Sequence, residues 1–126
     1  MKMIIGGTCQ GKVAYASQKY GIKPEEWKDG GQCREEELYT AKGVYNFHQW
    51  IRKTMEAGEN ISQIPEKISE KNPELILVTD EVGNGIVPME REEREWREAC
   101  GRICTKLAAF SEEVIRVCCG IGQKIK

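Results

Sequence analysis

Gly6-Gly7-Thr8-Cys9-Gln10-Gly11-Lys12 is the stretch that decides how this chain folds. It matches the phosphate-binding pattern G-x-x-x-x-G-K, in which glycines let backbone N–H groups curl around an anion and the lysine reaches the outer phosphates. The full pattern continues with Ser or Thr, whose hydroxyl holds Mg²⁺, but position 13 is Val. The sequence therefore predicts a phosphate site, and leaves open whether that site transfers phosphoryl groups or only binds them.

The size and charge of the chain limit its function. It has 126 residues and a formal net charge of −1, which fits one domain over residues 1–126, by the usual prior of roughly 100–200 residues per domain. Such a charge creates no field for nucleic acid or an anionic membrane, so neither is expected as a partner. No apolar run approaches the roughly 20 residues that cross a bilayer, and the N-terminus lacks a signal-peptide pattern. We expect a cytoplasmic protein.

The six cysteines are expected to be reduced and mostly buried. They are Cys9, Cys33, Cys100, Cys104, Cys118 and Cys119, and they include no C-x-x-C pair. Structural zinc sites need paired spacings, so a zinc site built from Cys33 and a distant pair is the weaker alternative. A disulfide framework is not expected in a chain without an export signal.

Apolar runs and helical patterns alternate along the chain. Strands are expected at residues 2–5, 75–79 and 114–119, with a short extended piece within 24–32. Helices are expected at 12–20, 35–55, 61–72 and 89–110. In the second of these, Val44, Phe47, Ile51 and Met55 would form one stripe, and Gly43 could divide the segment into two helices. Gly120-Ile121-Gly122 is expected to turn the chain into an edge strand at 123–126.

This alternation predicts a three-layer α/β fold with a mostly parallel central sheet, reduced in size, and an antiparallel edge strand near residue 126. Ligands bind at the carboxyl ends of parallel strands. The glycine loop follows the first strand, Asp80-Glu81 follow the central strand and Gly120 follows the last one. We therefore expect these three segments to meet at one edge.

Each candidate site residue has a plain structural alternative. The predicted nucleotide-binding set is Gly6, Gly7, Thr8, Cys9, Gln10, Gly11, Lys12 and Val13, with Lys12 in a catalytic role; the alternative is a glycine turn without a ligand. Asp80-Glu81 at a strand end could bind Mg²⁺ or position a nucleophile, and Glu81, or Asp29 if residues 27–29 form a strand, is the predicted metal ligand; the alternative is a solvated acidic turn. Thr8 could supply a hydroxyl, although nothing in the spacing requires it.

His48 is the single histidine of the chain. Its chemistry suits nucleophilic attack on phosphorus or general-base work near neutral pH, and it is carried as a second catalytic candidate. A lone histidine beside an apolar stripe is more often structural.

Several blocks of the chain resemble the bifunctional adenosylcobinamide kinase / adenosylcobinamide-phosphate guanylyltransferase family. The blocks are the glycine loop, residues 77–88 (Leu-Val-Thr-Asp-Glu-Val-Gly-Asn-Gly-Ile-Val-Pro), residues 101–109, and residues 114–126 with their Gly-Ile-Gly-x-Lys-Ile-Lys ending. The resemblance implies a P-loop α/β fold and ATP- or GTP-dependent phosphorylation of the aminopropanol arm of adenosylcobinamide in cobalamin synthesis. It also implies guanylyl transfer through a histidine and, in many members, a homotrimer.

The chain departs from the family pattern at three places. The family loop ends Gly-Lys-Ser where this chain has Gly11-Lys12-Val13, and the family signature Thr-Asn-Glu-Val becomes Thr79-Asp80-Glu81-Val82. The segment that carries the guanylyl-accepting histidine has no counterpart, so that role is not carried onto His48. The resemblance thus favours kinase-type chemistry with nucleotide and adenosylcobinamide as partners. The alternatives are a catalytically degenerate nucleotide- or corrinoid-binding partner protein, and an oligomeric scaffold whose glycine loop is only a turn.

Overall fold

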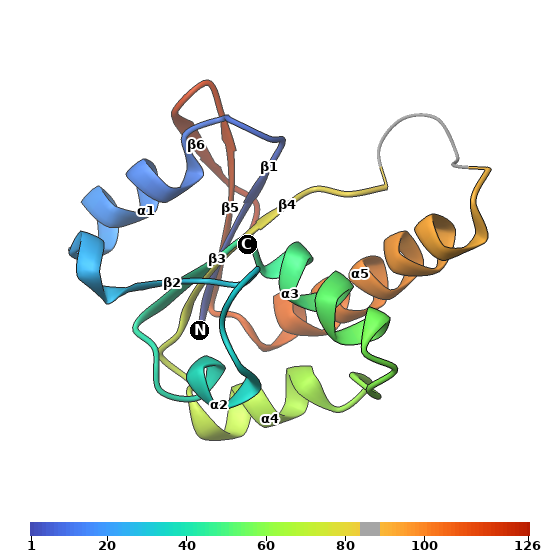
Figure 1. Cartoon of the computed structure of the whole chain (residues 1–126). Helices are drawn as coiled ribbons and strands as arrows, with labels where there is room; N and C mark the ends of the chain where they lie inside the picture. Colours follow the sequence, from blue (N-terminus) through green and yellow to red (C-terminus); the bar gives the residue numbers. More distant parts are fainter. Residues whose placement is uncertain (84–88) are drawn as a thin grey trace.

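A six-stranded sheet forms the centre of the computed structural model, which describes residues 1–83 and 89–126 (Figure 1). The strands are β1 (Lys2–Gly6), β2 (Trp27–Asp29), β3 (Gly43–Tyr45), β4 (Ile76–Asp80), β5 (Glu113–Cys118) and β6 (Ile121–Lys124). The helices are α1 (Lys12–Tyr20), α2 (Glu35–Leu38), α3 (Phe47–Glu56), α4 (Ile64–Lys71) and α5 (Arg91–Phe110), with a 3-10 turn at Pro24–Glu26. Residues 84–88 of the resembling block lie outside the described residues.

The strand order is β2-β3-β4-β1-β5-β6, and all neighbours pair in parallel except β5 and β6. The predicted α/β class, mostly parallel sheet and antiparallel edge strand are confirmed. The expected turn is shifted, because Ile121 and Gly122 already pair with β5 and the turn is Cys119-Gly120. Both turn residues have positive φ, 51° and 76°, the combination that joins two antiparallel strands most compactly.

Helices cover the two faces of the sheet unequally. One apolar cluster joins alternate strand residues such as Met3 and Leu77 to helices α2, α3, α4 and α5. The other joins Ile4, Ile76 and Val78 to α1 alone. The sheet is thus the middle of three layers, one of them thin (Figure 1).

The prediction of helix over residues 35–55 is wrong in its middle part. Gly43, Val44 and Tyr45 form β3, which lies between β2 and β4 and pairs with both. A side chain at Gly43 would overlap the Trp27 ring at 2.6 Å, so the glycine permits the close contact of β2 and β3. Asn46, with φ of 54°, then turns the chain into α3. The apolar spacing that suggested one helical stripe runs across this strand–helix junction.

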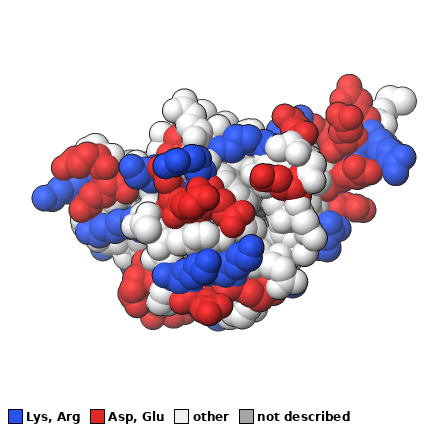
Figure 2. Space-filling view, turned by 60° about the horizontal axis from the view of Figure 1, so that its bottom comes forward, with Lys and Arg blue, Asp and Glu red and all other residues white. Residues whose placement is uncertain are grey.

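Two surface properties complete the description. None of the helices in residues 1–83 and 89–126 has the length and apolar character needed to cross a membrane. Acidic and basic side chains are interspersed over the face shown in Figure 2.

Candidate functional site

The glycine loop runs from the end of β1 to the start of α1. Gly6 has φ of 154°, and a Cβ there would lie 2.4 Å from the carbonyl oxygen of Val117 on β5. Gly11 caps α1 in the left-handed region, with φ of 83°. These two glycines let the loop turn tightly while it touches the neighbouring strand. Lys12 begins α1, so the helix starts at the loop, as phosphate loops require.

Gln10 fastens the loop to the turn between β5 and β6. The Gly120 N–H donates to the Gln10 backbone oxygen at 2.8 Å, and the Cys119 N–H donates to Gln10 Oε1 at 2.7 Å. On the other side, the β1–β4 register sets Gly6 opposite Asp80, and the Glu81 N–H donates to the Gly6 oxygen at 2.8 Å. The predicted meeting of the three segments at one edge is therefore confirmed.

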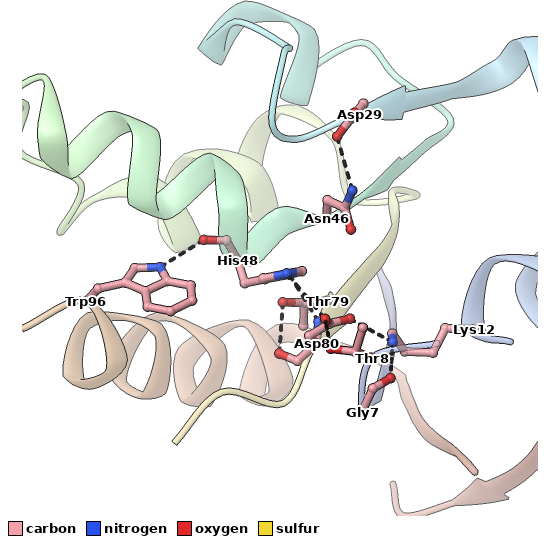
Figure 3. A network of polar contacts seen from close by, with 9 residues as sticks. All are labelled: Gly7, Thr8, Lys12, Asp29, Asn46, His48, Thr79, Asp80 and Trp96. Carbon is pink, nitrogen blue, oxygen red and sulfur yellow. Dashed lines mark hydrogen bonds and ion pairs between the residues drawn. The ribbon is translucent and has the colours of Figure 1, made fainter. Parts of the chain in front are cut away.

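Lys12 points back across its own loop (Figure 3). Its Nζ lies 2.7 Å from Asp80 Oδ1 and donates to the Gly7 oxygen at 2.5 Å. The side chain is 7% exposed. The ammonium group is thus held at the carboxyl edge of the sheet, inside the loop that would surround a phosphate.

Asp80 is the hub of the polar network drawn in Figure 3. Its Oδ2 accepts a hydrogen bond from Thr8 Oγ1 at 2.9 Å, while Oδ1 faces Lys12. Burial raises the pKa of this carboxyl group, but the hydrogen bonds from Lys12 and Thr8 and the positive charge of Lys12 outweigh burial and lower the pKa below its usual value. Asp80 is therefore a carboxylate at neutral pH.

His48 lies behind Asp80 at the start of α3. The Asp80 N–H donates to His48 Nδ1 at 3.2 Å, and His48 Nε2 lies 3.4 Å from Asp80 Oδ2. Trp96 Nε1 donates to the His48 backbone oxygen at 2.9 Å, which fixes the start of the helix against α5. Burial lowers the pKa of the imidazole more than Asp80 raises it. The neutral ring, with Nδ1 accepting, carries its proton on Nε2 toward the carboxylate.

A pocket of about 300 Å³ opens beside the loop. Its lining joins the loop residues to Tyr45, Asn46, Val78 and Asp80, so β3 and β4 form its other wall. Val13 also lines the pocket and packs against the apolar cluster of the α1 face. A second hollow, of about 740 Å³, lies on the opposite side of the loop, where Gly7 and Gln10 face Arg116 and Gln123.

The two residues predicted to hold a metal make separate contacts. Glu81 Oε2 accepts from Arg116 Nη2 at 3.1 Å. Asp29 Oδ1 accepts from the Gly31 N–H at 2.9 Å and from Asn46 Nδ2 at 3.3 Å, and its strand is separated from β4 by β3. Within the described part of the chain, no three His, Cys, Asp or Glu residues are grouped to hold a metal ion by themselves.

Sequence reasoning considered Asp80 together with Glu81 but committed only to Glu81, and it missed Asn46. Asp80 stood beside Glu81 in the expected loop, but its position as the last residue of β4 is the signal that directs it at the glycine loop. Asn46 was assigned to a helix, and it lines the pocket because β3 was missed.

The sheet, with its glycine loop between the central strand and the first helix, defines a P-loop type of α/β protein. The family model for cobinamide kinase / cobinamide phosphate guanyltransferase matches residues 34–125, and the chain belongs to this family. It is 41% identical over 91 residues to the bifunctional adenosylcobalamin biosynthesis protein CobU of Salmonella typhimurium, and 40% identical over 91 residues to the protein of that name of Escherichia coli. Each match covers 71% of this chain and 50% of the relative, so the chain spans about half the length of these relatives.

Proposed function

We propose that this protein binds ATP or GTP at residues 6–13 and transfers the terminal phosphoryl group to the alcohol of adenosylcobinamide. The observation that supports this most is the buried Lys12 ammonium, held inside a glycine loop at the start of α1. The acceptor comes from the family, whose description and relatives concern cobinamide and adenosylcobalamin biosynthesis.

The residues of the loop would act by position and charge. Backbone N–H groups of Gly7 to Lys12 would surround the phosphates, and Lys12 would contact the β- and γ-phosphates. Phosphoryl transfer of this kind depends mainly on orientation and on neutralising the charge of the transferred group. A divalent cation, if held beside the loop, would supply further charge neutralisation.

Guanylyl transfer is a weaker candidate activity for this chain than phosphoryl transfer. His48 is 5% exposed, and both of its ring nitrogens face Asp80. A histidine that accepts GMP must present a free nitrogen to the nucleotide. We therefore propose that His48 acts on the site only through its contacts with Asp80, and that it is not the group that accepts GMP.

The alternative function is a nucleotide- or corrinoid-binding partner protein without catalysis, which the isopropyl group of Val13 favours because it cannot bind a metal. A homotrimer and a cytoplasmic location remain proposals that rest on family resemblance and composition. A phosphoryl-transfer assay with γ-labelled ATP and GTP separates the two functions. Label on adenosylcobinamide supports the kinase; nucleotide binding without transfer supports the partner protein.

The Lys12→Met variant tests the phosphate site directly. It keeps the aliphatic stem and removes the charge, so we expect the dissociation constant for ATP or GTP to rise at least tenfold, about 1.4 kcal/mol. Lys19→Met, an exposed lysine near the end of the same helix, is the matched control and should bind as the parent does. Isothermal titration calorimetry measures both, and an unchanged dissociation constant in Lys12→Met would exclude this assignment.

A further inference from the structure

Phosphate loops normally hold their cation through the residue after the lysine and an acid on a neighbouring strand. Here the first of these is Val13, whose side chain packs into the apolar cluster on the α1 face. β3, the strand on the far side of β4, is followed by Asn46, an amide. Asp80, which ends the neighbouring β4, is then the available acid, and a hydroxyl oxygen must come from a residue other than Val13 if the site binds Mg²⁺.

Two oxygens beside the loop fit that need. Thr8 Oγ1 and Asp80 Oδ2 are 2.9 Å apart, and both residues line the pocket of about 300 Å³. Asp80 is 17% exposed, so its carboxylate is accessible from the pocket. A hydroxyl that donates its proton to a carboxylate keeps a lone pair for a cation, and Mg²⁺ commonly binds through one carboxylate plus phosphate and water oxygens.

We propose that Thr8 and Asp80 form the protein side of a Mg²⁺ site that fills together with the nucleotide. This inference rests on the proposed nucleotide binding. The ammonium of Lys12 lies 2.7 Å from Asp80 Oδ1 and balances its charge. Phosphates that attract Lys12 leave this carboxylate without a cation beside a polyanion, and a divalent cation restores the balance.

The two acids predicted from the sequence are less suited to this role. Glu81 is paired with Arg116 on the β5 side of the loop. Asp29 accepts two hydrogen bonds at the end of β2, and neither donor belongs to the loop. His48 supports Asp80 instead, because its contacts with the Asp80 N–H and with Oδ2 hold both the backbone and the carboxylate in place. His48 is in this sense a positioning residue.

The test measures binding of fluorescent ATP and GTP analogues in EDTA and again in excess Mg²⁺. For the parent protein we expect Mg²⁺ to tighten binding by about tenfold or more, about 1.4 kcal/mol. In Asp80→Asn the Mg²⁺ gain should fall below about twofold, while binding in EDTA becomes tighter, because the carboxylate no longer competes for Lys12 or repels phosphate. Thr8→Val, which removes the hydroxyl, should lose part of the Mg²⁺ gain. Glu81→Gln and Asp29→Asn are matched controls that should keep the full gain.

Mn²⁺ provides a second measurement that does not depend on any variant being stable. The electron paramagnetic resonance signal of free Mn²⁺ should decrease when nucleotide is added to the parent protein, beyond the decrease given by nucleotide alone. The inference is overturned if Asp80→Asn, folded by circular dichroism, keeps the full Mg²⁺ gain, or if Glu81→Gln or Asp29→Asn removes it. Parent protein that binds nucleotide equally in EDTA and Mg²⁺ also overturns it, but leaves the proposed nucleotide site standing. Absence of nucleotide binding under both conditions refutes the proposed function itself.

Discussion

The two faces of the sheet differ in how much of the chain covers them. On one face, α2, α3, α4 and α5 bury a large cluster that includes the stacked rings of Phe47 and Trp50, whose centroids are 5.7 Å apart. On the other face, the nine-residue α1 is the main cover, and Tyr15, Tyr20, Trp27 and Tyr45 are only partly buried.

This difference separates stability from ligand binding. The phosphate-loop pocket is lined by Val78 and Tyr45, whose side chains belong to the thin face. The pocket beside the glycine loop is therefore found where helical cover is least. The thickly covered face, whose four helices all lie within the matched residues 34–125, holds His48 and through it Asp80. The face covered by α1 would leave space for the ligand, and the face covered by four helices would hold Asp80 in position through His48.

Alanine at neighbouring positions of β4 gives the largest expected effect. Leu77 is fully buried under the four helices, and Ile76 is buried under α1. We expect Leu77→Ala to lower the free energy of unfolding by about 4 kcal/mol and Ile76→Ala by about 2–3 kcal/mol, because a single helix can relax into the cavity more easily. Urea denaturation of both variants measures this. Equal losses would mean that the two faces are equally rigid, and the comparison would fail.

The ion pair between Lys12 at the start of α1 and Asp80 at the end of β4 should give the next largest effect. Lys12→Met leaves a mostly buried carboxylate without its ammonium partner, so we expect a loss of about 2–3 kcal/mol in the free energy of unfolding. Thr8 and His48 still contact Asp80, which keeps the loss below that of an isolated charge. Adding Asp80→Asn should recover about half of it, and a double-mutant cycle from thermal unfolding quantifies the coupling. Strictly additive losses would show that the pair contributes no coupling.

The smallest expected effect is the change of stability with pH that comes from the buried thiol of Cys100. Burial raises the pKa of Cys100 in α5 from 9.0 to about 12. Between these values the unfolded chain loses the thiol proton and the folded protein keeps it, so the free energy of unfolding falls as the pH rises from 9 toward 12. At pH 10.5 the loss from this group should be about 1–2 kcal/mol.

Cys100→Ala should therefore flatten the alkaline decline of stability relative to the parent. Cys9→Ala, an exposed cysteine of the phosphate loop, is the control and should follow the parent curve. Chemical denaturation at pH 8, 9.5 and 10.5 under reducing conditions measures the slopes. A decline that is as steep in Cys100→Ala as in the parent would contradict the assignment of this thiol to the tightly packed face.

The sequence predicts the sheet better than it predicts the site. The parallel order and the meeting of three loops follow from apolar runs separated by helices, because crossover rules leave few arrangements. The sequence does not reveal β3, because this three-residue strand is joined through Asn46 directly to α3 and its apolar residues keep the spacing of a helix. The sequence does not reveal the pairing of Lys12 with Asp80 for another reason. Adjacent residues at the end of a strand point in different directions, and the sequence does not say which of Asp80 and Glu81 faces the loop. The sequence shows at Val13 that the hydroxyl is missing and offers Thr8 as another one, but nothing in the spacing requires Thr8 to take that role.

Gln10 links the glycine loop directly to the β5–β6 hairpin. By accepting two consecutive amides of the β5–β6 turn, it couples the motions of the loop to those of the edge hairpin. The connection from the loop to the edge of the sheet therefore runs through two hydrogen bonds and not through a helix. The amide protons of Cys119 and Gly120 are therefore natural spectroscopic reporters of the conformation of the loop.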